Sequence, residues 1–188
     1  MTTTDRGRRP DRTGRAGTTG DAGGGDTREG RAGTDPARRA GTDYRLLVAD
    51  RDGSTTRLDY RRLLGQRFES RSCEYRCGSG DRWGGWWRGV PVGRLLDLAD
   101  VDGTATHLVV ASGGGDYTAC VPLRVALDGV LALERDGDRL PLGERAPRLV
   151  APDLDSIRTV KGVERVRAVR LAPDEDRDER ESFAGRLD

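Results

Sequence analysis

Residues 77–96 read C-G-S-G-D-R-W-G-G-W-W-R-G-V-P-V-G-R-L-L, and this stretch gives the clearest indication of the fold. The preceding segment 68–77 alternates roughly between apolar and polar residues, which predicts a strand that ends at Cys77. Glycines in 78–87 predict a loop. Residues 92–99 (VGRLLDLA) follow a proline and have a compact apolar face, which predicts a short helix. The sequence therefore presents a cysteine at the end of a strand, next to a glycine-rich loop.

Short strands separated by turn residues dominate the chain on both sides of this stretch. Many short strands with two or three helices predict an α+β fold built from β-rich mixed sheets. Upstream, the pattern predicts a strand over 44–49 and a short helix over 57–64, whose apolar residues have helical spacing. Downstream, it predicts strands over 107–112 and 116–123, a hairpin over 130–142 with its break at 136–138, an apolar segment at 147–151 and a last strand over 163–171.

Composition divides the 188 residues into three parts. Residues 1–43 hold ten glycines and no Val, Ile, Leu, Phe, Trp or Tyr, so this arm lacks the apolar surface that would offset its ordering entropy. We expect the arm to be disordered. Residues 172–188 carry seven acids and three arginines and are expected to form a solvated tail. The predicted domain is therefore 44–171, with 21 basic and 18 acidic residues.

Several classes of protein are disfavoured. No run of about 18–20 apolar residues is present, which excludes a membrane-spanning helix. The Arg8-Arg9 pair is followed by Pro10-Asp11 where a secretory leader would be apolar, so we expect a cytoplasmic protein. A net charge of +1 makes nucleic acid an improbable partner, although RNA binding through the arginine- and glycine-containing arm 1–43 stays open. The three cysteines do not suggest a disulfide scaffold.

Two interpretations of Cys77 follow from the residues alone. A thiolate beside a glycine-rich loop can reach a bound group and is a good ligand for a soft or high-valent metal. Alternatively, Cys77 is a small buried residue next to a tight turn. The neighbouring Trp83, Trp86 and Trp87 could form a stacking platform for a planar ligand, and Trp83 and Trp86 could form the entrance to such a site.

A series of motifs resembles the signature of the sulfite-oxidase-like, molybdopterin-dependent oxidoreductases. In that family a cysteine, followed three residues later by glycine, precedes a W-x-G-V-P-x-x-x-L-L stretch. The resemblance covers about 43–171. The matching residues are Cys77, Gly80, Trp87, Gly89-Val90-Pro91, Leu95-Leu96, Asp116-Tyr117, Pro122-Leu123, the box from Ala146 to Pro152, and Arg158 to Lys161.

The resemblance implies a sulfite-oxidase-like catalytic-domain fold and a molybdenum–molybdopterin cofactor. In that family the cysteine sulfur binds the molybdenum directly, so Cys77 is the implied metal ligand and catalytic residue. The implied cofactor-binding residues supply a strand-end hydroxyl, an arginine suited to phosphate or pterin oxygen, and a basic loop. They are Ser112, Arg148, Ser156, Ile157, Arg158 and Lys161, the last being the sole lysine of the chain.

The implied activity is oxygen-atom transfer to or from a small oxyanion or oxide substrate, with the cysteine as a ligand of the metal. A separate redox partner protein is expected, because the sequence has no evident haem or iron–sulfur ligand set. The chain also departs from the family pattern. Asp81 replaces a tryptophan, Gly143 stands near an expected asparagine, and little of the predicted domain precedes Cys77, where relatives place further cofactor contacts. These departures leave a non-catalytic binding or interaction module, with the fold but no cofactor, as the alternative.

Overall fold

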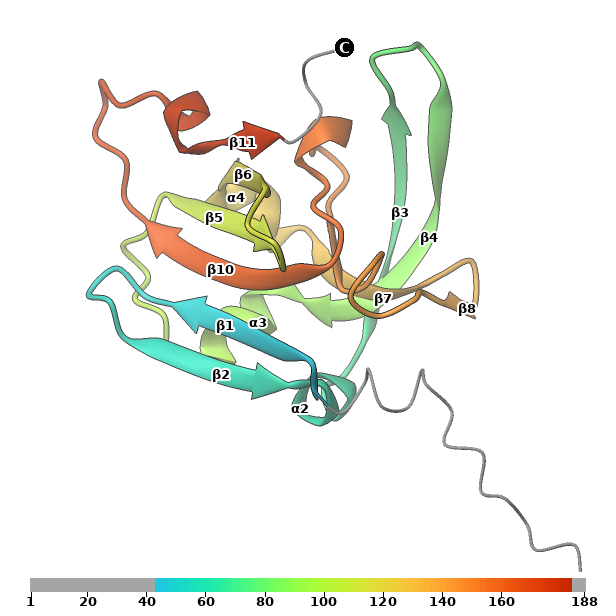
Figure 1. The fold of residues 1–188 in the computed structure, drawn as a ribbon, viewed down its shortest axis with the longest axis horizontal. Helices are drawn as coiled ribbons and strands as arrows, with labels where there is room; N and C mark the ends of the chain where they lie inside the picture. The colour runs from blue at the N-terminus through green and yellow to red at the C-terminus, as the bar shows by residue number, and fades with distance from the viewer. Residues whose placement is uncertain (1–42, 184–188) are drawn as a thin grey trace, which may run out of the picture. The chain divides into compact units, whose positions relative to one another are not determined.

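Two β-sheets joined by short helices form the fold of the computed structural model, which describes residues 43–183 (Figure 1). The predicted arm 1–43, and the RNA binding suggested for it, lie outside the described residues except for Asp43. No helix within 43–183 has the length and apolar character needed to cross a membrane. The β-rich, mixed α+β class predicted from the sequence agrees with these elements.

The first sheet has six strands in the order β11-β6-β5-β10-β1-β2. Strand β1 runs parallel to β10, whereas every other neighbouring pair is antiparallel, so the sheet is mixed. Its strands are β1 (Arg45–Ala49), β2 (Thr55–Asp59), β5 (His107–Ser112), β6 (Tyr117–Pro122), β10 (Val163–Val169) and β11 (Ser182–Phe183).

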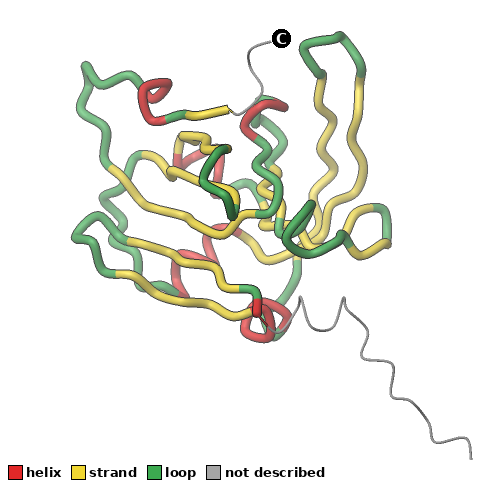
Figure 2. The backbone as a smooth tube through the Cα atoms, in the orientation of Figure 1, coloured by secondary structure: helices red, strands yellow, loops and turns green. Residues whose placement is uncertain are grey.

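The second sheet has five antiparallel strands in the order β3-β4-β7-β8, and β9 also pairs with β7. Its strands are β3 (Glu69–Arg76), β4 (Arg82–Pro91), β7 (Val130–Arg135), β8 (Asp138–Arg139) and β9 (Arg148–Val150). Figure 2 shows how short the helical pieces between the strands are. They are α2 (Tyr60–Leu64), α3 (Val92–Leu98), α4 (Leu123–Leu127) and the 3-10 turns η1 (Ser156–Arg158) and η2 (Arg177–Arg180).

Strand β4 carries the alternation that places its side chains on two faces. Trp86 is 63% exposed, whereas Trp87 is 1% exposed and lies in the core. Gly89 lies next to the register shift between β4 and β7, and a Cβ built there would be 2.1 Å from the Leu131 carbonyl oxygen. The strands approach this closely because position 89 has no side chain.

The predicted loop over 78–87 is wrong beyond residue 81, where β4 begins. Strands β3 and β4 form a hairpin whose register runs from Glu69 opposite Gly89 to Arg76 opposite Arg82. A Cβ at Gly84 would lie 2.5 Å from the Cys73 carbonyl oxygen, so this glycine permits close strand approach within the hairpin. The glycine content predicted too long a loop, because Gly84 and Gly85 lie inside β4 and only Gly78 and Gly80 lie in the turn.

The predicted helix over 57–64 is wrong in its first half, because β2 continues to Asp59. Helix α2 begins at Tyr60, with Asp59 as its N-cap: the Asp59 carboxylate accepts a hydrogen bond of 2.7 Å from the Arg62 backbone N–H. The helix predicted over 92–99 is present as α3, and the hairpin break predicted at 136–138 separates β7 from β8.

In the described part of the expected solvated tail, residues 172–180 are mostly exposed, whereas residues 181–183 pack on the domain. Strand β11 pairs with β6, so β10 is not the last strand. The Glu181 side chain is 3% exposed and forms an ion pair of 2.8 Å with Arg158. The sequence showed an acidic, apolar-poor segment, but it did not show that a buried arginine elsewhere in the chain requires one of these acids.

We predict that Gly89→Ala lowers the free energy of unfolding by about 3 kcal/mol, because the added methyl group forces β4 away from β7. The matched control is Gly103→Ala, since a Cβ at residue 103 meets nothing within 4 Å and the change should leave stability near the wild-type value. Urea unfolding of the three proteins measures both effects. Equal destabilisation by the two substitutions would contradict the close approach described here.

Candidate functional site

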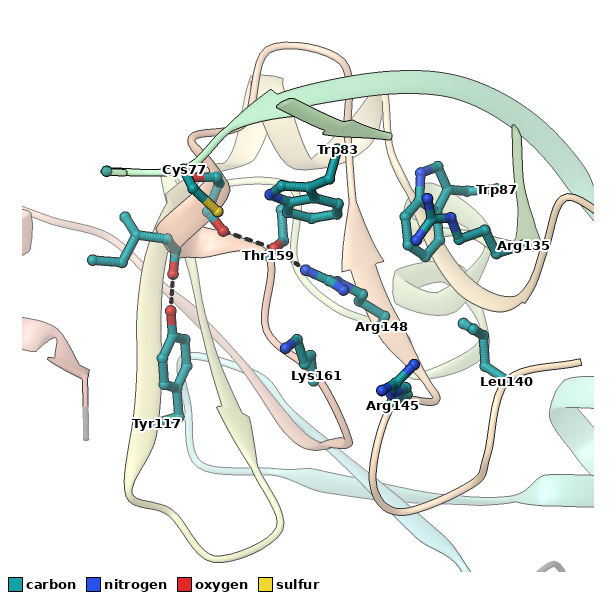
Figure 3. A pocket seen from close by; sticks show the side chains of 13 residues that line it. Cys77, Trp83, Trp87, Tyr117, Arg135, Leu140, Arg145, Arg148, Thr159 and Lys161 are labelled. Carbon is teal, nitrogen blue, oxygen red and sulfur yellow. Dashed lines mark hydrogen bonds between the residues drawn. The ribbon is translucent and has the colours of Figure 1, made fainter. Parts of the chain in front are cut away.

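A cavity of about 730 Å³ is lined by residues from both sheets (Figure 3). The β3–β4 hairpin, β7 and β9 contribute from one sheet, β6 contributes from the other, and the segment around η1 lies between β9 and β10 in the sequence. The lining residues are Cys77, Gly78, Trp83, Trp87, Tyr117, Arg135, Leu140, Arg145, Arg148, Ser156, Ile157, Thr159 and Lys161.

The charge of this lining is entirely positive. Arg135, Arg145, Arg148 and Lys161 contribute four cationic side chains, and none of the lining residues is acidic. Burial lowers the pKa of the Lys161 ammonium, and the nearby guanidinium groups of Arg148 and Arg145 lower it further. Positively charged side chains around a cavity repel one another and attract a negatively charged ligand. The electrostatics therefore favour an anion.

Arg148, on β9, is the most buried of these cations, at 9% exposed. Its guanidinium carbon lies 4.3 Å from the Trp83 ring centroid and 5.3 Å from that of Trp87, and its Nη2 donates a 2.7 Å hydrogen bond to Thr159 Oγ1. Burial is the main cause that lowers the pKa of Arg148 to about 10, so the group stays cationic at neutral pH. Its Nε is buried and has no hydrogen-bond partner among the described residues. A buried donor without a partner in a cavity wall indicates a place for a ligand.

Cys77 lies in the turn that follows β3. Its backbone N–H donates to the Asp81 carbonyl oxygen at 2.8 Å, and its carbonyl oxygen accepts from the Gly80 N–H at 2.9 Å. Gly80 has φ +91°, which glycine adopts without strain. The turn leaves the Cys77 thiol half-buried on the cavity wall (Figure 3). Within 43–183, no three His, Cys, Asp or Glu side chains come together as a metal site, so a metal here would have a single thiol ligand from these residues.

Hydrogen bonds fix the segment around η1 to the other cavity walls. The Ser156 hydroxyl donates to the Arg76 carbonyl oxygen at 2.8 Å, next to Cys77 in the sequence. The Tyr117 hydroxyl donates to the Ile157 carbonyl oxygen. The Thr159 hydroxyl donates to the Ser156 carbonyl oxygen at 2.7 Å while it accepts from Arg148. The segment is therefore bonded to β3, β6 and β9.

Five of the seven site residues predicted from the sequence line this cavity: Cys77, Arg148, Ser156, Ile157 and Lys161. Ser112 ends β5 beside Val163 and is not part of the lining. Arg158 is also absent from the lining, although both of its neighbours in the sequence are present. The predicted cofactor contacts of Ser112 and Arg158 therefore have no support from the geometry.

Arg158 is instead surrounded by carboxylates, and its side chain is 10% exposed. The nearest carboxylate oxygens are those of Asp155 at 2.6 Å, Glu181 at 2.8 Å and Asp178 at 2.9 Å. The hydrogen bond with Glu181 is the main cause that raises the pKa of Arg158. A matching motif position identifies the segment and not the direction in which its side chain points, so the cofactor contact of Arg158 stays a prediction without support from the cavity lining.

Four polar residues line the cavity that were not predicted as site residues from the sequence: Arg135, Arg145, Tyr117 and Thr159. In a chain with 32 arginines, neither arginine stood out. Tyr117 lies in one of the matching motifs and Arg145 directly precedes another. Their position in or next to a motif is the feature of the sequence from which they could have been predicted. Of the two tryptophans expected at the entrance, Trp83 lines the cavity and Trp86 does not.

Comparison with known proteins agrees with the fold and the motifs. Residues 33–175 match the family model of the oxidoreductase molybdopterin binding domain. The crystal structure of the sulfane dehydrogenase SoxCD from Paracoccus pantotrophus is similar, with a TM-score of 0.62 and 19% sequence identity. The match covers 71% of this chain and 40% of that chain, so this chain corresponds to less than half of the SoxCD chain. Among curated proteins, none matches the sequence.

The family match extends over most of the chain and includes every residue that lines the cavity. The resemblance to sulfite-oxidase-like, molybdopterin-dependent oxidoreductases and the corresponding fold prediction are both confirmed. The chain belongs to the oxidoreductase molybdopterin-binding domain family.

Proposed function

We propose that the cavity binds molybdenum–molybdopterin and that the protein is an oxidoreductase acting on a small oxyanion or oxide. One observation carries this proposal: the Cys77 thiol and four cationic side chains converge on a single cavity whose lining has no acidic residue. Membership of the molybdopterin-binding family supports the same conclusion.

The side chains present fit the chemical groups of this cofactor. Molybdopterin carries a phosphate, a pterin ring with several hydrogen-bonding atoms, and sulfur atoms that bind the metal. Arg148 Nε is an unpartnered buried donor for pterin or phosphate oxygen, and the Trp83 ring is a planar surface beside it. Arg145 and Lys161 are cations for the phosphate. A volume of about 730 Å³ is within the range of about 300–1,000 Å³ that is common for cofactor sites.

Each residue has a role that follows from its chemistry. When bound, the molybdenum centre supplies oxygen-atom transfer coupled to a two-electron change of its oxidation state. Cys77 would hold the metal through its sulfur. Lys161 would also attract an oxyanion substrate into the cavity, whereas the Arg135 guanidinium is paired with the Asp136 carboxylate at 3.2 Å.

The electrons released in such a reaction need an acceptor, and we propose a separate redox partner protein. One histidine and three cysteines are few ligands for a second redox centre in the same chain. The cytoplasmic location stays a prediction from the sequence.

The first test is the metal content of the protein produced in a host that makes molybdopterin. We expect about one molybdenum per chain in the wild type and almost none in Cys77→Ser, because a serine hydroxyl is a poor ligand for this metal. Cys120→Ala is the matched control, since that thiol is buried and does not line the cavity. Elemental analysis and pterin fluorescence give the readout. A wild-type protein without molybdenum and without pterin would support the non-catalytic binding module instead.

The second test concerns the cations. We expect Arg145→Ala and Lys161→Ala each to weaken molybdopterin binding by about 10- to 100-fold, because each removes a charged hydrogen-bond donor worth about 1.5–3 kcal/mol. Arg124→Ala removes an exposed charge from α4, outside the cavity, and should leave affinity unchanged. Quenching of tryptophan fluorescence in the apoprotein reports binding. Equal losses in all three variants would mean that only the total charge matters.

A further inference from the structure

Arg158 is held by the C-terminal segment. Its Nε and Nη2 bond to the two oxygens of Glu181 at 2.8 and 2.9 Å, which is a bidentate pair. The Glu181 side chain is 3% exposed, whereas those of Asp155 and Asp178, which bind the same guanidinium, are 63% and 62% exposed. Glu181 Oε1 also accepts a 2.9 Å hydrogen bond from the Cys120 backbone N–H on β6. Glu181 is therefore the buried partner in this cluster.

The turn that contains Arg158 forms part of the cavity wall. Ile157 and Thr159, on either side of Arg158, both line the cavity. The Ile157 carbonyl oxygen receives the Tyr117 hydroxyl, and Thr159 is bonded to Arg148 (Figure 3). Any movement of Arg158 would therefore be transmitted to two cavity residues through these hydrogen bonds.

A second contact links the same C-terminal segment to the cavity. Strand β11 extends the six-stranded sheet beside β6, with Phe183 opposite Tyr117 (Figure 1). The Phe183 and Tyr117 rings are 5.0 Å apart between centroids, at an interplanar angle of 58°. Residues 175–183 therefore contact the cavity wall at two places. Glu181 pairs with Arg158, between two lining residues, and Phe183 packs on Tyr117, which is itself a lining residue.

We propose that residues 175–183 act as a strap that positions the cofactor-binding wall of the cavity, with Arg158 and Glu181 as positioning residues that do not touch the ligand. The inference rests on the proposed function for the identity of the ligand. In this proposal the Arg158–Glu181 pair fixes the position of η1, so that Ile157 and Thr159 face the cavity. Thr159 in turn holds Arg148 through their hydrogen bond. Residues behind the ligand-contacting groups of a site commonly control affinity in this way.

The test compares Glu181→Gln with Asp178→Asn in the full chain. Both substitutions remove one negative charge from the Arg158 cluster, but only the first acts on the buried partner. We expect Glu181→Gln to weaken molybdopterin binding about tenfold and to speed hydrogen–deuterium exchange of the backbone amides in 156–161. Asp178→Asn should stay near the wild type in both measurements, because exposed ion pairs contribute little.

The measurements are made well below the unfolding temperature of each variant, so that a loss of global stability does not count as support. If Glu181→Gln lowers only the unfolding temperature, while affinity and exchange match the wild type, the strap is overturned. If Glu181→Gln does not fold, Phe183→Leu leaves the ion pair intact and removes the ring contact with Tyr117, and we expect the same two changes.

The two proposals fail in different ways. A wild-type protein that does not bind molybdopterin overturns the proposed ligand. Amide exchange in 156–161 can be measured in the apoprotein, so equal exchange in the wild type and Glu181→Gln without ligand overturns the strap.

Discussion

The site depends on the burial of a guanidinium that has no acidic partner among the described residues. The Arg148 guanidinium packs against the Trp83 and Trp87 rings and is hydrogen-bonded to the Thr159 hydroxyl. Aromatic faces attract cations but leave the N–H donors unsatisfied, so Nε has no partner. A buried donor without a partner costs about 1–3 kcal/mol, and an anionic ligand that accepts this hydrogen bond would recover part of that free energy. The arrangement is therefore less favourable empty than with an anion bound.

A second buried arginine has the opposite environment. Arg158 has three carboxylates around it, and its donors are committed to them. Both arginines are linked to the same turn: Arg148 is hydrogen-bonded to Thr159, and Arg158 is the last residue of η1, directly before Thr159. Where carboxylates neutralise the guanidinium, it stabilises the fold; where they are missing, its charge is free to bind. This difference in partners distinguishes a structural arginine from a candidate ligand-binding one.

The hairpin β3–β4 connects the core to the cavity. Trp87 is buried in the core, yet its ring also contacts Arg148 and Arg135 at the cavity. Gly84 and Gly89 let β4 lie close to its neighbours on both sides, and the Trp83 and Trp87 rings on this strand are 6.1 Å apart between centroids. Packing and site geometry are therefore set by the same strand, and a change in one alters the other.

The sequence by itself determined the α+β class and the family, because these depend on periodicity and on the order of short motifs. It also predicted that Cys77, Arg148 and Lys161 belong to one site, and all three line the same cavity. Only the tertiary structure decided where side chains point and which distant groups meet. Arg158 faces Glu181, which lies 23 residues later in the sequence. Gly84 and Gly85, which were predicted to lie in a loop, are inside β4. Pairing between distant residues depends on how the sheets bring them together, and local sequence patterns do not determine that arrangement.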